Sequence, residues 1–282
     1  MADRATIVCM MRIKNVERWL AQSLASVSPL VDGIVILDDG STDRTPEICR
    51  ACPKVVRYAY QEGSLPDEYR DKNRLLQWSL ELSPDWIMVL DGDEVLEDRA
   101  PSVIHAEVGE VLRDATECVA LEARFLYFWN KPGWYVDEET WHPLLFTTWG
   151  QALSSLRFDY DVPWAKLHCG RTPSNLRGKR RKMDVCVKHY GYQTFRDAWR
   201  KYRFYVKHDV VRAREGYYDH LLRRRVKLRR WAERSQDDGV RIFEGDSQRD
   251  ALPRASWRSR VTAAIPPRYL RPLRIAKYLL WG

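Results

Sequence analysis

The chain has 282 residues, 45% hydrophobic and 12% aromatic, which is enough to bury a large core as one α/β domain or as a domain with an appendage. Its net charge of +8 hides a division: residues 1–150 carry 15 Lys and Arg against 26 Asp and Glu, whereas residues 151–282 carry 32 against 13. No apolar stretch is long enough to span a bilayer, which excludes a membrane-spanning protein, and the basic second half predicts an anionic partner.

Strands and helices are expected to alternate through the first hundred residues. Short apolar runs predict strands at four places, and periodic apolar faces predict helices between them, one beginning at Pro46 in the first helical position. The strands are expected at residues 6–11, 33–37, 55–60 and 86–90, and the helices at 16–27, 45–51 and 70–82. This alternation indicates a mainly parallel sheet with right-handed crossovers, flanked by helices.

The second part of the chain is less regular. Strands are expected at residues 119–128 and 144–147, and a helix at residues 194–215 with Thr194 as its cap. Basic amphipathic helices are expected at residues 221–231 and 268–281, where they would either contact an anionic membrane or pack on the domain. We therefore predict a domain at residues 1–215, with halves at 1–98 and 99–215, and a basic helical extension at 216–282.

The cysteines and the N-terminus indicate a cytoplasmic location, peripheral at most on the inner face of the membrane. Six cysteines are scattered along the chain and predict free thiols in a reducing compartment. Cys49 and Cys52 form the one close pair, for which a redox role is the less favoured interpretation. The N-terminus leads into a strand and does not resemble a signal peptide.

Asp91 and Asp93 follow the apolar run at residues 86–90 directly. Alternate residues of an extended chain point the same way, so both carboxylates are expected to face one point beyond the strand. Two hard oxygen ligands suit Mg²⁺ or Mn²⁺, ions that also bind substrate phosphates. The strand expected at residues 33–37 is followed by Asp38, Asp39 and the run Gly-Ser-Thr-Asp. This pattern predicts either the floor of a polar pocket that binds a nucleobase N–H or a capped turn.

Several motifs together resemble family 2 glycosyltransferases, which have the GT-A fold, a Rossmann-like sheet. They are Met11-Arg-Ile-Lys-Asn-Val-Glu17, Val35-Ile-Leu-Asp-Asp-Gly-Ser-Thr-Asp43, the "DxD" segment Asp85-Trp-Ile-Met-Val-Leu-Asp-Gly-Asp-Glu94, and Lys188-His-Tyr-Gly-Tyr192. They occur in order, each near an expected strand end, over residues 5–210. The resemblance implies an inverting transferase that uses a nucleotide-sugar donor, by default a UDP-sugar, and a divalent metal.

The resemblance also implies roles for individual residues. Asp39 matches the residue that binds the donor base, with Arg12 beside the nucleotide. Asp91 and Asp93 match the pair near the ribose and the metal, and Lys72 falls near the diphosphate, although relatives commonly have arginine there. His189 is expected to complete the metal shell with Asp91 and Asp93; the alternative is a core histidine.

An inverting transferase needs a carboxylate that takes the proton of the acceptor hydroxyl. The segment between Trp134 and Trp141 offers Asp137, Glu138 and Glu139 beside rings that can stack on sugars, and the sequence does not choose among the three. Asp161 is an outside candidate. His168 competes with His189, but Cys169 stands where some relatives have glutamate. The basic run at residues 177–182 is either a lid over the donor phosphates or a solvated charge run.

The sequence thus predicts a hexosyltransferase-like enzyme that transfers a sugar to a glycan, lipid-linked or other hydroxyl acceptor, for example in cell-surface polysaccharide synthesis. The absence of Gly-x-Gly-x-x-Gly and Gly-x-x-x-x-Gly-Lys-Ser/Thr loops excludes dinucleotide oxidoreductases and P-loop enzymes. Two alternatives remain: a basic protein that binds nucleic acid or an anionic surface, and a degenerate GT-A domain that binds sugars without turnover. We expect no specific nucleic-acid binding, because the acidic motifs would repel phosphate.

Overall fold

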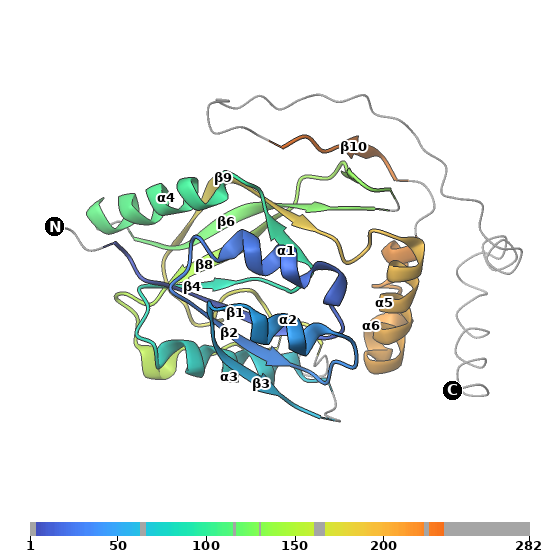
Figure 1. Cartoon of the computed structure of the whole chain (residues 1–282), viewed down its shortest axis with the longest axis horizontal. Coiled ribbons are helices and arrows are strands. Elements are labelled where there is room, and N and C mark those ends of the chain that lie inside the picture. The colour runs from blue at the N-terminus through green and yellow to red at the C-terminus, as the bar shows by residue number, and fades with distance from the viewer. Residues whose placement is uncertain are drawn as a thin grey trace, which may run out of the picture.

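The structure, a computed structural model, describes residues 4–62, 66–114, 117–129, 131–160, 167–222 and 226–233. At its centre is an eight-stranded sheet (Figure 1). Its strands, in spatial order, are β3 (Val55–Tyr60), β2 (Gly33–Asp38), β1 (Ile7–Ile13), β4 (Trp86–Val89), β8 (Trp141–Thr147), β6 (Cys118–Tyr127), β9 (Lys179–His189) and β5 (Glu94–Leu96).

The sheet is parallel from β3 to β4 and mixed beyond. Strand β1 pairs in parallel with both β2 and β4, and β2 pairs in parallel with β3. Strand β8 is antiparallel to β4 and β6, β9 is parallel to β6, and β5 is antiparallel to β9. The predicted α/β class with a mainly parallel sheet is confirmed.

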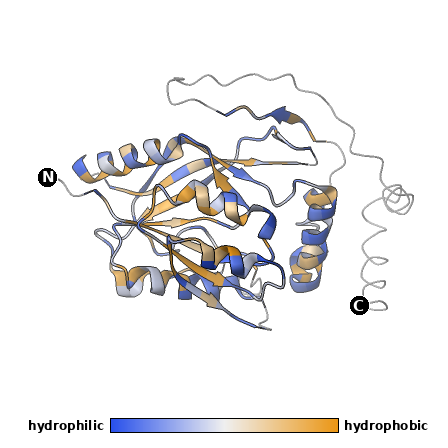
Figure 2. Cartoon of the chain, viewed as in Figure 1, coloured by the Kyte–Doolittle hydropathy of each residue, from blue (hydrophilic) through white to orange (hydrophobic). Residues whose placement is uncertain are grey.

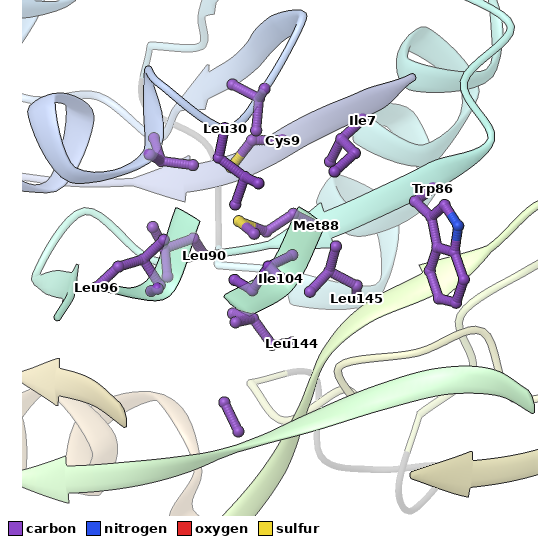
Figure 3. Packing of buried hydrophobic residues seen from close by; sticks show 14 of the residues in the cluster. Ile7, Cys9, Leu30, Trp86, Met88, Leu90, Leu96, Ile104, Leu144 and Leu145 are labelled. Carbon is purple, nitrogen blue, oxygen red and sulfur yellow. The ribbon is translucent and has the colours of Figure 1, made fainter. Parts of the chain in front are cut away.

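Helices cover both faces of the sheet because successive strand residues point to opposite sides. Ile7, Cys9 and Met11 of β1 pack into a core with α1 (Glu17–Val27), α2 (Thr45–Ala51) and α4 (Ala100–Asp114). The alternate residues Val8 and Met10 join a second core under α3 (Glu68–Leu80). Figure 3 shows part of the first core, and the central strands are largely hydrophobic in Figure 2.

The sequence pattern predicted the strands and helices up to β4 but missed several elements that follow it. Helix α3 begins at Glu68, where the Asp67 side chain accepts a hydrogen bond from the Arg70 N–H and caps the helix. The helix expected at residues 194–215 is two helices, α5 (Phe195–His208) and α6 (Val210–Arg214). The break falls at Asp209, whose side chain caps α6 by accepting from the Arg212 N–H. The elements that were not predicted include β5, α4, β7 (Trp134–Val136), η1 (Leu153–Ser155) and β9.

Of the two interpretations of residues 177–182, the lid is wrong, whereas the solvated charge run agrees with the exposed side chains of Arg177, Lys179, Arg180 and Lys182. Residues from Lys179 to Lys182 begin strand β9 and pair in parallel with β6. Arg181 forms ion pairs with Glu107 and Glu110 of α4. These bonds tie the segment to the sheet, so it is a strand with a charged outer face and not a loop that closes over a ligand.

The helix predicted at residues 221–231 is also wrong where the structure describes it. A single 3₁₀ turn, η2 (Asp219–Leu222), is followed by strand β10 (Leu228–Arg230), which pairs antiparallel with β7. Leu228 is buried, Arg229 is half-buried and Arg230 is exposed, so exposure to solvent rises along this short strand. The helix predicted at residues 268–281 lies outside the described residues, and the domain boundary at residue 215 stays a prediction.

Two features of the described ranges concern membrane spans and cysteines. None of the helices there is both long and apolar enough to cross a membrane. All six cysteines are free thiols.

Candidate active site

The carboxyl ends of β1, β2 and β4 lie side by side at one edge of the sheet. The register pairs Ile13 with Asp38 and Met10 with Val89, so the segments that follow these strands are neighbours. Loops at this edge are where open α/β sheets bind ligands. The two predicted aspartate motifs therefore belong to one region.

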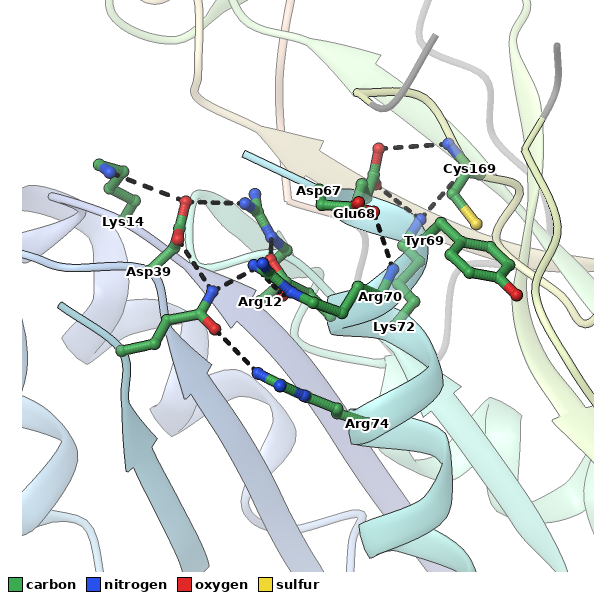
Figure 4. Close-up of polar contacts among 12 residues, drawn as sticks. Arg12, Lys14, Asp39, Asp67, Glu68, Tyr69, Arg70, Lys72, Arg74 and Cys169 are labelled. Carbon is green, nitrogen blue, oxygen red and sulfur yellow. Dashed lines mark hydrogen bonds and ion pairs between the residues drawn. The ribbon is translucent and has the colours of Figure 1, made fainter. Parts of the chain in front are cut away.

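Arg12 sits at the centre of the first group of charges (Figure 4). Its Nη2 donates to Asp39 Oδ2 at 2.7 Å and its Nε donates to Asp71 Oδ2 at 2.7 Å. Gln61 Nε2 also donates to Asp39, and the guanidinium of Arg70 pairs with Asp71. We call this group the Arg12 cluster (Arg12, Asp39, Gln61, Arg70 and Asp71).

The Arg12 cluster is buried and electrically paired. Burial disfavours the charge on Arg12, but the carboxylates of Asp39 and Asp71 outweigh burial and raise its pKa. Asp39 is 1% exposed. Lys14 Nζ lies 3.7 Å from Asp39 Oδ2, so two cations and an amide share this carboxylate. The preceding Asp38 has a structural task instead: it accepts from the Ser41 N–H and the Tyr58 hydroxyl, while Gly40 takes a φ of 78°.

Lys72 is committed to a loop. Its ammonium donates to the carbonyl oxygens of Cys169 and Gly170 at 2.9 and 3.0 Å and pairs with Glu68 at 2.8 Å. A lysine ammonium has three N–H donors, and these three contacts use them. In this arrangement Lys72 holds residues 169–170 against α3, and binding a diphosphate would require it to give up one of these partners.

Asp91 and Asp93 do not lie on an extended chain. The Glu94 N–H donates to the Asp91 carbonyl, so residues 91–94 form a tight turn between β4 and β5. We expected both carboxylates to face one point because residues 91 and 93 would alternate along a strand. That reasoning is wrong, because these residues lie in a turn. The turn directs them to different partners: Arg171 near Asp91, and Lys201 with His189 at Asp93.

Glu94 and Arg171 hold the turn in place. Arg171 forms a two-pronged ion pair with Glu94 at 2.9 Å on each side, and Glu94 also accepts from the Asp91 N–H. The same guanidinium donates to the carbonyls of Val89 and Pro143, just past the last paired residues of β4 and β8. Arg171 thus links the end of β4 to β8, next to the turn that carries the two aspartates.

The charges around Asp91 make it a poorly compensated acid. Its Oδ2 lies 3.9 Å from Arg171, which is already bound to Glu94. Enclosure by surrounding protein and the nearby Glu94 charge raise the pKa of Asp91 to about 6, even though 46% of its side chain remains exposed. A cation at this position would stabilise the charged form of Asp91.

Asp93 lies between a lysine and a histidine. Lys201 Nζ is 2.8 Å from Asp93 Oδ2, and His189 Nε2 is 3.8 Å from Asp93 Oδ1. Burial by itself would raise the pKa of Asp93, but Lys201 and His189 lower it below its usual range. Asp93 and the charged residues around it form a second group. We call it the Asp93 cluster (Asp91, Asp93, Glu94, Arg171, His189 and Lys201).

Gly191 makes the convergence of these side chains possible. A Cβ at this position would lie 2.2 Å from Lys201 Nζ, 2.6 Å from Asp93 Oδ2 and 2.6 Å from His189 Cε1. The pairing of β5 with β9 sets Glu94 opposite His189, and the Tyr190 N–H donates to the Asp93 carbonyl. The DxD turn and the His-Tyr-Gly-Tyr segment are therefore neighbours, as their shared site in the sequence prediction requires.

The predicted metal ligands, Asp91, Asp93 and His189, stay a prediction. Burial lowers the pKa of His189 to about 4, so its ring is neutral and can bind a cation. His189 Nδ1 is buried without a hydrogen-bond partner in the part of the chain that is described, which is unusual for such a group. Among the described residues, however, no group of three or more His, Cys, Asp or Glu side chains is placed so that it could hold a metal ion. A metal bound by Asp91, Asp93 and His189 would therefore require these side chains to move.

The acidic segment predicted to supply the base leads into β8. Asp137 forms ion pairs with Lys227 and Arg229, which outweigh its burial and lower its pKa. Glu139 accepts from Trp141 Nε1 at 2.7 Å, and Glu138 is exposed. Asp137 therefore serves to hold the end of β7 against β10.

A chain of rings connects the start of β8 to the Asp93 cluster. The Tyr127 hydroxyl lies 2.9 Å from His142 Nε2, and the Tyr127 ring centroid is 5.1 Å from that of His189. His168, the competing histidine, is engaged elsewhere: its Nε2 is 2.5 Å from the Tyr218 hydroxyl, which donates to Asp209. Asp161 lies outside the described residues.

Three residues that shape the site were not predicted. Glu94 was quoted only as part of a motif, and Arg171 and Lys201 belong to basic stretches with no recognisable pattern. The signal available for Glu94 was its place directly after the DxD turn. No local signal distinguishes Lys201 from the other cations of α5, because its role depends on contact with Asp93.

Parts of the chain are similar to known proteins. Residues 7–122 match the family model described as Glycosyl transferase family 2. The chain is 30% identical over 133 residues to an uncharacterized protein of Mycobacterium tuberculosis, covering 45% of this chain and 31% of that protein. It is 30% identical over 124 residues to a TPR repeat-containing protein of Synechococcus elongatus, covering 41% and 29%. The chain spans about a third of the length of these relatives.

Solved glycosyltransferase structures are also similar. Glucosyl-3-phosphoglycerate synthase from M. tuberculosis, in complex with Mn²⁺, UDP and glucosyl-3-phosphoglycerate, is 25% identical over 44% of each chain, with a TM-score of 0.33. Staphylococcus aureus TarS (residues 1–349), in complex with UDP-GlcNAc, is 12% identical over 77% of this chain and 70% of that chain, with a TM-score of 0.43. Residues 7–122 therefore resemble glycosyltransferase family 2, and the mixed α/β sheet is of the fold class predicted from the sequence.

Proposed function

We propose that this protein is a metal-dependent inverting glycosyltransferase that moves a sugar from a nucleotide-diphosphate sugar, by default a UDP-sugar, to an acceptor hydroxyl. The observation that carries the proposal is the meeting of the Arg12 and Asp93 clusters at one sheet edge, in a chain whose residues 7–122 match the family 2 model. One cluster offers a carboxylate for a base N–H, and the other offers ligands for a divalent cation.

The chain's own groups divide the work. Asp39, held by Arg12 and Gln61, would accept the base N–H of the nucleotide. Asp91, Asp93 and His189 would hold Mn²⁺ or Mg²⁺, which as a Lewis acid offsets the charge of the departing diphosphate. Arg171 and Glu94 fix the turn that carries these ligands. Lys72, as described above, supports the neighbouring loop.

The catalytic base is proposed among Glu138, Glu139 and Asp137, with the two glutamates preferred. Glu138 and Glu139 are exposed, whereas the carboxylate of Asp137 is committed to Lys227 and Arg229. Glu138→Gln and Glu139→Gln should separate the base from its neighbour. Transfer at the wild-type rate in both variants would clear the segment of this role.

The donor can be tested before the acceptor is known. Thermal unfolding should be measured with UDP, GDP and dTDP, each with and without Mn²⁺, because a ligand that binds the native state raises its apparent stability. We expect one diphosphate to stabilise the protein, and most strongly with metal. Donor-only turnover, the slow release of nucleotide from a UDP-sugar, gives a second measurement.

Asp91→Asn and Asp93→Asn should abolish donor turnover while the protein stays folded. The exposed Asp98 of the same segment provides a control, since Asp98→Asn should leave turnover unchanged. Full activity of either site variant in the presence of a chelator would overturn the metal assignment.

The acceptor stays a proposal in its broadest form: a glycan, a lipid-linked molecule or another hydroxyl compound, with cell-surface polysaccharide synthesis as the setting. Hexosyl transfer, contact with an anionic membrane and the cytoplasmic location likewise stay predictions. The nucleic-acid alternative can be tested by DNA retention, which should be weak, unselective and sensitive to salt.

A further inference from the structure

We propose that Lys201 is a ligand of the donor diphosphate, and that without nucleotide its ammonium occupies the place of the metal at Asp93. Metal alone therefore binds weakly, and the diphosphate draws Lys201 away from Asp93 as it binds. This inference rests on the proposed function and names a residue that the family motifs do not include.

The contact between Lys201 and Asp93 is direct and enclosed. The ammonium is 2.8 Å from Asp93 Oδ2 and 4.9 Å from the centre of the Tyr192 ring, and its side chain is 28% exposed. Gly191 leaves no room for even a methyl group between Lys201 and the carboxylate. The positive charge is thus set against one of the carboxylates that a metal would need.

Helix α5 fixes the base of the lysine but leaves its head adjustable. Thr194 caps the helix by accepting from the Asp197 N–H, and Arg18 of α1 donates to Gln193 and Asp197. These contacts anchor the helix to the edge that carries the site. The four-carbon stem of a lysine can still rotate its ammonium to a neighbouring anion without moving the helix.

Like charges explain why the ammonium and a divalent cation exclude each other at Asp93. A metal bound to Asp93 Oδ2 would lie within a few ångströms of Lys201 Nζ, where repulsion between cations is strong in a partly enclosed site. A diphosphate at this edge supplies a new anionic partner for the ammonium. The nucleotide would then both free Asp93 for the metal and bind Lys201.

A purely structural salt bridge is the competing explanation, and two binding measurements distinguish it. Mn²⁺ alone and, separately, UDP and uridine in excess chelator are titrated calorimetrically into wild type and Lys201→Met. We expect the variant to bind Mn²⁺ alone at least tenfold more tightly, because its competitor is gone. We also expect it to bind UDP at least tenfold more weakly without metal, with uridine unaffected.

Lys207, an exposed cation near the end of the same helix, gives the matched control: Lys207→Met should bind Mn²⁺, UDP and uridine like the wild type. If Lys201→Met does not fold, Lys201→Gln keeps a polar contact to Asp93 without the charge and should show the same two changes. Mn²⁺ affinity that is unchanged or weaker in the folded variant overturns the proposal. Failure of the wild type to bind any nucleoside diphosphate overturns the proposed function instead.

Discussion

The two charged clusters at the sheet edge are built differently. The Arg12 cluster is drawn from residues 12–71 and shares each aspartate between two or more donors. The Asp93 cluster joins residues from 91 to 201, and Arg171 is the partner of its Glu94. It also contains His189 Nδ1, which is buried and has no hydrogen-bond partner among the described residues. In the Arg12 cluster the charges are paired and each aspartate has several donors, which suits a rigid binding site for a nucleobase. In the Asp93 cluster the acids outnumber the cations, which suits a site that binds an additional cation.

The largest effect is expected from removing Arg171. Arg171→Met leaves the charge of Glu94, which is 2% exposed, without its cation. Loss of one partner of a buried ion pair should lower the free energy of unfolding by about 3–5 kcal/mol in urea denaturation. The control is Lys179→Met, whose pair with Glu117 is fully exposed and should contribute little. Similar losses in the two variants would contradict the distinction.

Gly191→Ala should come next, because it pushes apart the side chains that meet at Asp93. Overpacking of this kind costs about 1–3 kcal/mol, and the displaced Lys201 and Asp93 should also weaken binding of metal and nucleotide. Gly109→Ala in α4 is the matched control: its Cβ would meet only Arg113 Nη1 at 3.5 Å. That change should raise stability by about 0.5–1 kcal/mol, so a loss in both variants would point to a general intolerance of alanine.

Arg12→Met tests the redundancy of the other cluster. Asp71 keeps Arg70 and Asp39 keeps Gln61, so we expect a loss of about 2 kcal/mol, less than for Arg171→Met. Stabilisation by nucleotide should fall in the same variant, measured by thermal shift with UDP. A loss of stability as large as that of Arg171→Met would show that the two clusters are equally dependent on one arginine.

The smallest effect concerns acid stability and His142, which connects the acidic segment to the Asp93 cluster. Burial and the nearby Arg171 lower the pKa of His142 to about 4, against about 6.5 in an unfolded chain. The unfolded state therefore binds the proton first, and the stability that the neutral ring provides above pH 6.5 is lost as pH falls toward 4. Between pH 7 and pH 5 this amounts to about 1–2 kcal/mol.

His142→Gln should remove that share of the pH dependence, measured as urea midpoints at the two pH values. The matched comparison is the exposed His220, because His220→Gln should leave the difference between pH 7 and pH 5 as it is in the wild type. Equal pH dependence in His142→Gln and the wild type would exclude the ring as the source.

The sequence by itself predicted the parallel half of the sheet, the resemblance of residues 7–122 to glycosyltransferase family 2, and the places of Asp39 and Asp91 directly after strands. Those features are local: apolar runs, helix periodicity and polar residues directly after strands carry them. The tertiary structure alone decided which cation neutralises which acid. Lys72 binds the loop at residues 169–170, Arg171 pairs with Glu94, and Lys201 pairs with Asp93. These pairings depend on long-range packing, which no local sequence pattern encodes.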